Sequence, residues 1–318
     1  MPLQFDDVVD LDEIKERLAD PEPSVRRIAV MELIETAEPA AIPLVIMALR
    51  DDDAQVRAEA ARVLDEFEGP EVIGALLDGL HDADPAVRQK AAETLAENKN
   101  PAYAAQMIAA LACDDPFVKA SVFRGLREAK APEAQQAAMQ ALQDGDAGVR
   151  REAIGVLGYL RADEALFSLM NLARTDTAPE VRRAAVGALI FSKSDKVMAA
   201  LIEALRDDNW QVREEAATAI GKLQLGSGLQ PLIDTMQDEY WQVRQKAAAS
   251  LGKLKDPLAV PALGEALGFQ VSNLRKEAAA ALGEIAHASA VPFLEVALKD
   301  SDPDVRKLAR WALEQIAA

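Results

Sequence analysis

A two-residue step, Val-Arg, recurs along this chain of 318 residues at a nearly constant interval of 31 residues. The step occurs ten times, and its first residue is Val25, Val56, Val87, Val118, Val149, Val181, Val212, Val243, Leu274 and Val305 in turn. Lys119 replaces the Arg in the fourth step, and the fifth interval is one residue longer than the others. A sequence with such a period folds as a solenoid, in which each unit packs on its neighbours. We therefore expect a single domain over residues 1–318, although this length would ordinarily suggest two.

Each repeat carries the pattern of a helical hairpin. In residues 51–64, small or apolar residues fall at Val56, Ala60, Ala61 and Leu64, which form one stripe along a helix. Residues 40–50 predict a first helix before it. The second helix begins at an acidic residue that is often followed by Pro, as in Asp84-Pro85, because a carboxylate caps free amides and Pro suits the first turn. Ten such hairpins predict an all-α fold.

A carboxylate accompanies the repeated Arg at a fixed distance. An Asp stands six residues before the Arg in eight repeats: Asp20/Arg26, Asp51/Arg57, Asp82/Arg88, Asp144/Arg150, Asp176/Arg182, Asp207/Arg213, Asp238/Arg244 and Asp300/Arg306. A catalytic group would not need eight copies, so we interpret these residues as structural. Charge-assisted hydrogen bonds between them would form a ladder between neighbouring repeats and fix the stacking angle.

The signature D-x-x-x-x-V-R-x-x-A-A-x-x-L resembles HEAT repeats, specifically the short HEAT-like type of phycobilisome lyases, over essentially the whole chain. The resemblance implies a right-handed α-solenoid whose second helices line the concave surface. Five residues after the Val, the first nine repeats carry an apolar residue, whereas the tenth carries Arg310. A charge at a position that should face the next repeat suits a cap, so we expect residues 288–318 to be a C-terminal capping repeat.

The charge of the chain is strongly uneven. The net charge is −18, and residues 1–116 alone carry 10 Lys and Arg against 26 Asp and Glu. Nucleic-acid binding requires a basic surface, so this composition argues against it. The acidity serves solubility or faces a basic partner. The apolar stretches are too short to span a membrane, and the acidic N-terminus lacks the features of a secretory signal. With Cys113 as the single cysteine, we expect a cytoplasmic protein.

The position six residues after the Val lies opposite the buried stripe of the second helix. It is occupied by Met31, Arg62, Glu93, Arg124, Gly155, Gly187, Thr218, Ala249, Ala280 and Trp311. On the concave surface implied by the resemblance, the small residues from Gly155 to Ala280 would form the base of a groove. The alternative is that they merely reflect an Ala- and Gly-rich composition.

Aromatic residues make up only 4% of the chain, so their clustering is informative. Trp210, Tyr240 and Trp241 stand in turns where other repeats carry Pro, Ala or Asp, and Phe269 replaces the ladder Asp of the ninth repeat. We name these four residues the aromatic ridge. Trp210 and Trp241 are one repeat apart and should lie side by side. Exposed aromatic residues often mark recognition surfaces, although these residues would also pack together to compensate for the lost Asp.

The fourth repeat departs most from the pattern, because Cys113 replaces its Asp and Lys119 its Arg. Arg124 follows in the same repeat, and Tyr159 and Phe191 stand ten residues after the Val of later repeats, leaning toward the concave side. Arg124, Tyr159 and Phe191 would together hold an anionic group beside a flat apolar one. The alternative is a degenerate repeat that its neighbours tolerate.

Signals of catalysis are weak throughout the sequence. The two histidines, His81 and His287, are far apart and have no Cys or carboxylate at a ligand spacing, so we expect no metal site. The paired His-Glu motifs of deoxyhypusine hydroxylase, a similar solenoid, are missing. Gly226-Ser227-Gly228 is interpreted as a turn between repeats, and Cys113 has no His in its own or an adjacent repeat to activate it.

Two functions follow from these observations. The first is a non-enzymatic scaffold, or an assembly or maturation adaptor, that holds a protein partner on its concave face and aromatic ridge, with no cofactor. The second is a bilin lyase or bilin-handling chaperone, as the phycobilisome resemblance implies. Such proteins position a tetrapyrrole and its acceptor thiol, so the missing catalytic residues do not exclude this function. Arg124, Tyr159 and Phe191 would then be the candidate pocket.

Overall fold

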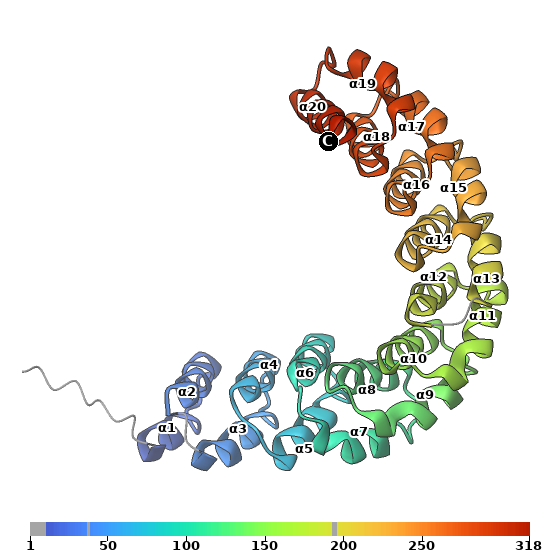
Figure 1. The fold of residues 1–318 in the computed structure, drawn as a ribbon. Helices are drawn as coiled ribbons and strands as arrows, with labels where there is room; N and C mark the ends of the chain where they lie inside the picture. The colour runs from blue at the N-terminus through green and yellow to red at the C-terminus, as the bar shows by residue number, and fades with distance from the viewer. Residues whose placement is uncertain (1–10, 37–38, 193–195) are drawn as a thin grey trace, which may run out of the picture. The chain divides into compact units, whose positions relative to one another are not determined.

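The computed structural model describes residues 11–36, 39–192 and 196–318, which form 20 α-helices linked by turns and short 3-10 helices (Figure 1). The fold is all-α, as the repeat pattern predicts. The chain divides into two compact units, Met1–Leu160 and Arg161–Ala318. One continuous domain over residues 1–318 stays a prediction.

The first unit contains five hairpins. Their helices are α1 Leu11–Arg17, α2 Pro23–Thr36, α3 Ile42–Ala48, α4 Ala54–Val63, α5 Pro70–Gly79, α6 Pro85–Glu97, α7 Ala104–Ala110, α8 Pro116–Glu128, α9 Gln135–Ala141 and α10 Ala147–Leu160. The even-numbered second helices contact one another in sequence from α2 to α10, and α3, α5 and α7 do the same in the row of first helices. The unit is therefore two layers of helices, as Figure 1 shows.

The second unit repeats this arrangement. Its helices are α11 Leu166–Thr175, α12 Pro179–Ala188, α13 Val197–Ala204, α14 Trp210–Leu223, α15 Leu229–Thr235, α16 Trp241–Leu254, α17 Val260–Ala266, α18 Ser272–Ile285, α19 Val291–Ala297 and α20 Pro303–Ala317. The second helices α12, α14, α16, α18 and α20 pack in succession and lie on the inside of the curve of this unit (Figure 1).

The core lies between the two layers and along the row of second helices. The first residue of the Val-Arg step is buried in nine repeats, and Val25 is half-buried. The stripe predicted in the second repeat, Val56, Ala60, Ala61 and Leu64, is at most 1% exposed. Five residues after the Val, all nine apolar residues are buried, whereas Arg310 is exposed. The period of the sequence thus identifies the buried face of each helix.

The capping prediction is also confirmed. Asp84, Asp115 and Asp302 lie at the N-caps of α6, α8 and α20, where their carboxylates accept hydrogen bonds from backbone amides of the first turn and a Pro follows at once. Asp53 caps α4 in the same way, so that helix begins at Ala54. The predicted first helix over residues 40–50 is a 3-10 turn, Pro39–Ala41, followed by α3.

Candidate protein-binding surfaces

The turns between first and second helices are held by the predicted ladder, and its geometry is bidentate. Arg26 Nε and Nη2 donate to the two carboxylate oxygens of Asp51 at 2.7 and 2.6 Å, while its Nη1 donates to the backbone carbonyl of Asp20 at 2.9 Å. The guanidinium of Arg26 therefore binds the carboxylate of the Asp in the following repeat and the backbone carbonyl of the Asp in its own repeat. We call one such Arg–Asp pair a rung. Among the described residues, the same bidentate contact joins Arg57–Asp82, Arg182–Asp207, Arg213–Asp238 and Arg275–Asp300.

The rungs are largely withdrawn from water and perturb the acidity of their members. Hydrogen bonds from Arg26, Arg57 and Arg275 hold the pKa of Asp51, Asp82 and Asp300, respectively, below the usual range. The same bonds raise the pKa of the arginines. Each carboxylate also accepts a backbone amide two residues later, as Asp51 does from Asp53 at 2.8 Å, so one side chain fixes both the turn and the neighbouring repeat.

Where the ladder Asp is replaced, the Arg finds another partner. At Cys113, Arg88 moves its hydrogen bonds to Asp115, two residues later, and places its guanidinium 4.5 Å from the centre of the Phe117 ring. At Phe269, the guanidinium of Arg244 lies 4.9 Å from the centre of the Phe269 ring. Lys119 still reaches Asp144, at 2.9 Å. At Phe269 a cation over an aromatic ring thus takes the place of the ion pair, whereas at Cys113 the ring contact is added to an ion pair with Asp115.

The aromatic ridge lies entirely in the second unit. Trp210 begins α14, and Tyr240 immediately precedes α16, which begins at Trp241. The rings of Trp210 and Tyr240 are stacked, with centroids 5.6 Å apart and planes inclined by 14°. The spacing of one repeat pointed to Trp241 as the neighbour of Trp210, but the ring that stacks on it is Tyr240. The pairing joins residues 30 positions apart, because Tyr240 lies one position ahead of Trp241 in the turn.

Tyr240 is the most open member of the ridge, with 40% of its surface exposed, whereas Trp210, Trp241 and Phe269 are half-buried. The guanidinium of Arg213, a member of the rung to Asp238, lies 5.6 Å from the centre of the Tyr240 ring. Phe269 covers Arg244 as described above. The rings of the ridge therefore pack within the turns, while Tyr240 stays partly exposed, and a role of the ridge in recognition stays a prediction.

Arg124 has a partner that the sequence did not indicate. Arg124, Arg127 and Arg151 all approach the carboxylate of Glu152, with nitrogen–oxygen distances of 3.4, 3.1 and 2.8 Å. Glu152 is buried, at 5% exposure, on the second helix α10. The anionic group beside Arg124 is thus supplied by the protein itself. This cluster stabilises the contact between α8 and α10.

The small residues of the expected groove are partly covered by long side chains. A Cβ atom on Gly155 would lie 3.1 Å from Nη1 of Arg127, and one on Gly187 would lie 3.3 Å from a carboxylate oxygen of Glu215. Thr218 donates its hydroxyl to the Glu214 carbonyl of its own helix, at 3.0 Å. Gly155 and Gly187 therefore make room for Arg127 and Glu215 to pack across the helices.

Tyr159 and Phe191 each carry their own cation. Lys130 Nζ lies 5.6 Å from the centre of the Tyr159 ring in the first unit, and the guanidinium of Arg161 lies 6.0 Å from the centre of the Phe191 ring in the second. Both rings remain exposed, at 46% and 44%. The two residues and Arg124 thus belong to separate local pairs.

The described residues hold no group of three or more His, Cys, Asp or Glu side chains arranged for a metal ion. His287 bonds locally to Ser289, at 2.8 Å. Cys113 is half-buried as a free thiol, and its Sγ lies 3.8 Å from the Asp115 carbonyl oxygen. Within the described ranges, no helix is both long and apolar enough to span a bilayer.

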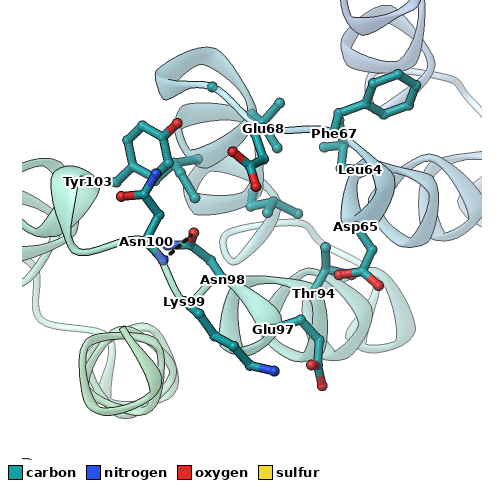
Figure 2. A pocket seen from close by; sticks show the side chains of 14 residues that line it. Leu64, Asp65, Phe67, Glu68, Thr94, Glu97, Asn98, Lys99, Asn100 and Tyr103 are labelled. Carbon is teal, nitrogen blue, oxygen red and sulfur yellow. Dashed lines mark hydrogen bonds between the residues drawn. The ribbon is translucent and has the colours of Figure 1, made fainter. Parts of the chain in front are cut away.

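A pocket in the first unit was missed by sequence reasoning. It has a volume of about 410 Å³ and lies where α4 and α6 end and α5 and α7 begin (Figure 2). We call it the acidic pocket; it is lined by Leu64, Asp65, Phe67, Glu68, Gly69, Val72, Ile73, Leu76, Thr94, Glu97, Asn98, Lys99, Asn100 and Tyr103. These residues are distributed over three successive repeats and share no motif. Another unforeseen feature is Phe167 of α11, which is 78% exposed.

Comparison with solved structures supports the fold. An engineered protein shares 23% identity at a TM-score of 0.52, with 96% of this chain and 98% of that chain covered. Kap95p bound to RanGDP gives a TM-score of 0.68 at 17% identity, and Kap95p bound to Nup1 gives 0.63 at 17%. Kap95p is yeast importin-β, and this chain, matched over 96% of its length, spans about half of it. At these identities the likeness shows the fold alone.

Among curated proteins, no sequence matches this chain. The pattern of HEAT repeats, in contrast, matches it in overlapping stretches: residues 11–96, 44–127, 74–148, 104–190, 136–208, 198–270 and 270–318. The match is to HEAT repeats in general and does not extend to the phycobilisome-lyase type. With its helical hairpins, its buried repeat positions and this match over nearly the whole length, the chain belongs to the HEAT-repeat family.

Proposed function

We propose that this chain is a non-enzymatic protein-binding scaffold, or an assembly or maturation adaptor, and that the aromatic ridge and the exposed face of the second helices receive the partner protein. The observation that carries the proposal is the stacked pair Trp210–Tyr240, which leaves 40% of Tyr240 exposed. Trp and Tyr dominate the binding energy of many protein interfaces.

The packing of the ridge favours binding for a second reason. Stacking on Trp210 and the cation of Arg213 below it restrict the rotamers of Tyr240. A side chain that is already ordered loses little conformational entropy when a partner covers it. The rung Arg213–Asp238 fixes the two turns that carry the rings, so the ladder positions the binding surface.

The comparison with Kap95p supports the proposal at the level of the fold. Kap95p is a similar solenoid with structures in complex with RanGDP and with Nup1. We infer that this chain also uses its helical repeats to bind a protein, without assigning it either partner. Repeat solenoids offer extended surfaces that suit this role.

The test is affinity purification of the tagged chain from its source cells beside a Trp210→Ala/Tyr240→Ala variant. A specific partner should bind the variant at least about tenfold more weakly, because removal of two interface aromatics commonly costs more than 1.4 kcal/mol. Phe167→Ala is the matched control, since it removes an exposed aromatic of the same unit outside the ridge. Circular dichroism must show equal helicity for all three proteins.

Equal affinity of wild type and the ridge variant for the recovered partner would contradict the proposed role of Trp210 and Tyr240. A loss of binding with Phe167→Ala alone would place the contact on the first-helix layer instead. Trp241→Ala, measured separately, shows whether this half-buried member of the ridge contributes.

The second candidate function, a bilin lyase or bilin-handling chaperone, depends on Arg124, Tyr159 and Phe191. Glu152 already pairs with Arg124, and the two rings carry the separate cations Lys130 and Arg161, so no specific observation favours this function over a scaffold. Adding a free bilin to the protein tests it directly. A shifted absorption band with increased fluorescence would support bilin binding, and a spectrum equal to that of bilin in buffer would contradict it.

A further inference from the structure

We propose that the acidic pocket of the first unit receives a lysine or arginine side chain from a basic segment of the bound protein. This inference rests on the proposed scaffold function and names the chemistry of its partner. It concerns a surface separate from the aromatic ridge, because all residues of the pocket lie between Leu64 and Tyr103.

The pocket has the size and the apolar wall that a long aliphatic side chain requires. Its volume of about 410 Å³ exceeds that of a single water site many times over and falls in the range of small-molecule pockets. Leu64, Val72, Ile73 and Leu76 are at most 3% exposed and form its inner wall together with Phe67. Lys and Arg bury their methylene stems on such surfaces while the charged end stays near water.

The mouth of the pocket carries an excess of negative charge. Asp65, Glu68 and Glu97 line it and are exposed, against the single cation Lys99. In the described part of the chain, none of these three carboxylates has a hydrogen bond or an ion pair with another side chain. Glu68 precedes α5 and Glu97 ends α6, so the two carboxylates come from different parts of the lining (Figure 2). Three unneutralised carboxylates favour a cationic ligand over a neutral or anionic one.

The negative charge of the surrounding sequence also favours a cationic ligand. Residues 1–116 carry 16 more acidic than basic side chains, nearly the whole net charge of the chain. A basic segment would be drawn toward this region over a distance of about one Debye length, roughly 8 Å at physiological salt. The pocket then provides a specific position within a region of general attraction.

Asn98 supplies a hydrogen-bond donor that the fold leaves without a partner. Its Oδ1 accepts a hydrogen bond from the Asn100 backbone amide at 3.2 Å, which fixes the amide group (Figure 2). Its Nδ2 is buried and makes no hydrogen bond within the described residues. A buried donor without a hydrogen-bond partner is unfavourable for the folded protein. Because Asn98 lines the pocket, its side-chain amide reports on a ligand that binds there.

The pocket is held open by local backbone features. Gly69, at φ 151°, links Glu68 to α5 in a conformation that side-chain-bearing residues rarely adopt. Across the neighbouring hairpin, Gln106 Nε2 donates to the Pro70 carbonyl at 3.0 Å and ties α7 to the start of α5. The pocket is therefore formed before a ligand arrives, which reduces the cost of binding.

The experiment uses the isotope-labelled full chain and two blocked amino acids as probes. Nα-acetyl-lysine N-methylamide should shift the side-chain amide signal of Asn98 saturably in NMR spectra, with a dissociation constant on the order of millimolar for so small a ligand. Nα-acetyl-norleucine N-methylamide has a similar stem without the ammonium group. The norleucine probe should bind at least about fivefold more weakly, since an exposed ion pair between an ammonium group and a carboxylate contributes up to about 1 kcal/mol.

Glu68→Gln/Glu97→Gln should weaken lysine-probe binding about fivefold or more, while Glu133→Gln, which removes an exposed carboxylate two repeats away, should leave it unchanged. The Asn98→Asp variant keeps the acceptor for Asn100 and identifies the amide signal by its disappearance. Equal binding of both probes, or no saturable shift at Asn98, would overturn the proposal.

The outcome is independent of the ridge experiment. The probes require no partner protein, so a failure here removes the pocket and leaves the scaffold function standing. Conversely, loss of the scaffold function would show in the purification experiment while the lysine probe still bound. The two failures are therefore distinguishable.

Discussion

Arg213 and Asp238 belong to neighbouring repeats and are joined by two hydrogen bonds of 2.7 and 3.0 Å, in a pair whose side chains are only about 10% exposed. The same guanidinium lies beside the Tyr240 ring. One arginine thus connects the repeat-to-repeat ladder with the candidate binding surface. Residues of the ladder and candidate binding residues are interleaved in the same turn, so the repeat pattern alone does not separate them.

The ladder should make stability depend on pH in the acid range. The folded-state pKa of Asp51, Asp82 and Asp300 is lowered by their arginine partners, so these groups add stability above their unfolded-state pKa of about 3.9. This contribution should be constant near neutral pH and be lost as pH falls below about 4 toward the folded pKa. Urea unfolding followed by circular dichroism at several pH values measures it.

In that experiment, Asp300→Asn is the informative variant. It removes one rung, so the free energy of unfolding should fall less steeply with decreasing pH than in the wild type. Its loss at pH 7 should be about 1–3 kcal/mol, the value of hydrogen bonds to a charged group. Glu314→Gln is a matched control on the exposed surface of the same repeat. An acid dependence identical in wild type and Asp300→Asn would show that the rung does not contribute it.

Restoring the missing carboxylate of the fourth repeat should stabilise the protein. Cys113→Asp places an acceptor where Arg26 and Arg57 find theirs, 25 residues after Arg88. Arg88 should then exchange its hydrogen bonds to Asp115 for a bidentate pair, with a gain of about 1 kcal/mol. The denaturation midpoint measures the gain, and Cys113→Asn controls for the loss of the thiol. A midpoint for Cys113→Asp no higher than that of Cys113→Asn would contradict the expected rung.

Close packing between second helices should be sensitive to one methyl group. A Cβ on Gly221 of α14 would lie 2.1 Å from Oγ and 2.8 Å from Cα of Ser250 on α16. Ser250 cannot easily withdraw, because its hydroxyl donates to the Ala217 carbonyl at 2.7 Å. Gly221→Ala should therefore destabilise the second unit by about 1–3 kcal/mol or more in urea denaturation.

The matched control is Gly226→Ala, since a Cβ there meets nothing within 4 Å. It should leave the denaturation midpoint nearly unchanged. Equal midpoints for the two variants would mean that α14 and α16 adjust their separation without cost. The same close approach recurs at Gly252 and Gly283, where a Cβ would lie 2.9 and 3.0 Å from Cα atoms of the next second helix.

The residues that follow several second helices adopt a backbone conformation that the sequence does not predict. Lys130, Arg161, Gln224, Lys255 and Ala286 all adopt a left-handed conformation, with φ between 52° and 56°, although none is glycine. They follow α8, α10, α14, α16 and α18, so the same left-handed exit recurs after five second helices. Local preference would have placed Gly there, and the tertiary contacts of the hairpin outweigh it.

The sequence alone determined the helical hairpins, their caps, the buried face of each second helix and the Arg–Asp ladder. These features depend on interactions that recur every 31 residues, so periodicity and local chemistry are sufficient to predict them. The tertiary structure alone decided which single residues meet. Trp210 stacks on Tyr240, Glu152 pairs with Arg124, and residues from three successive repeats enclose the acidic pocket. Each of these contacts depends on side-chain rotamers and on the offset between neighbouring helices, which a one-dimensional pattern does not contain.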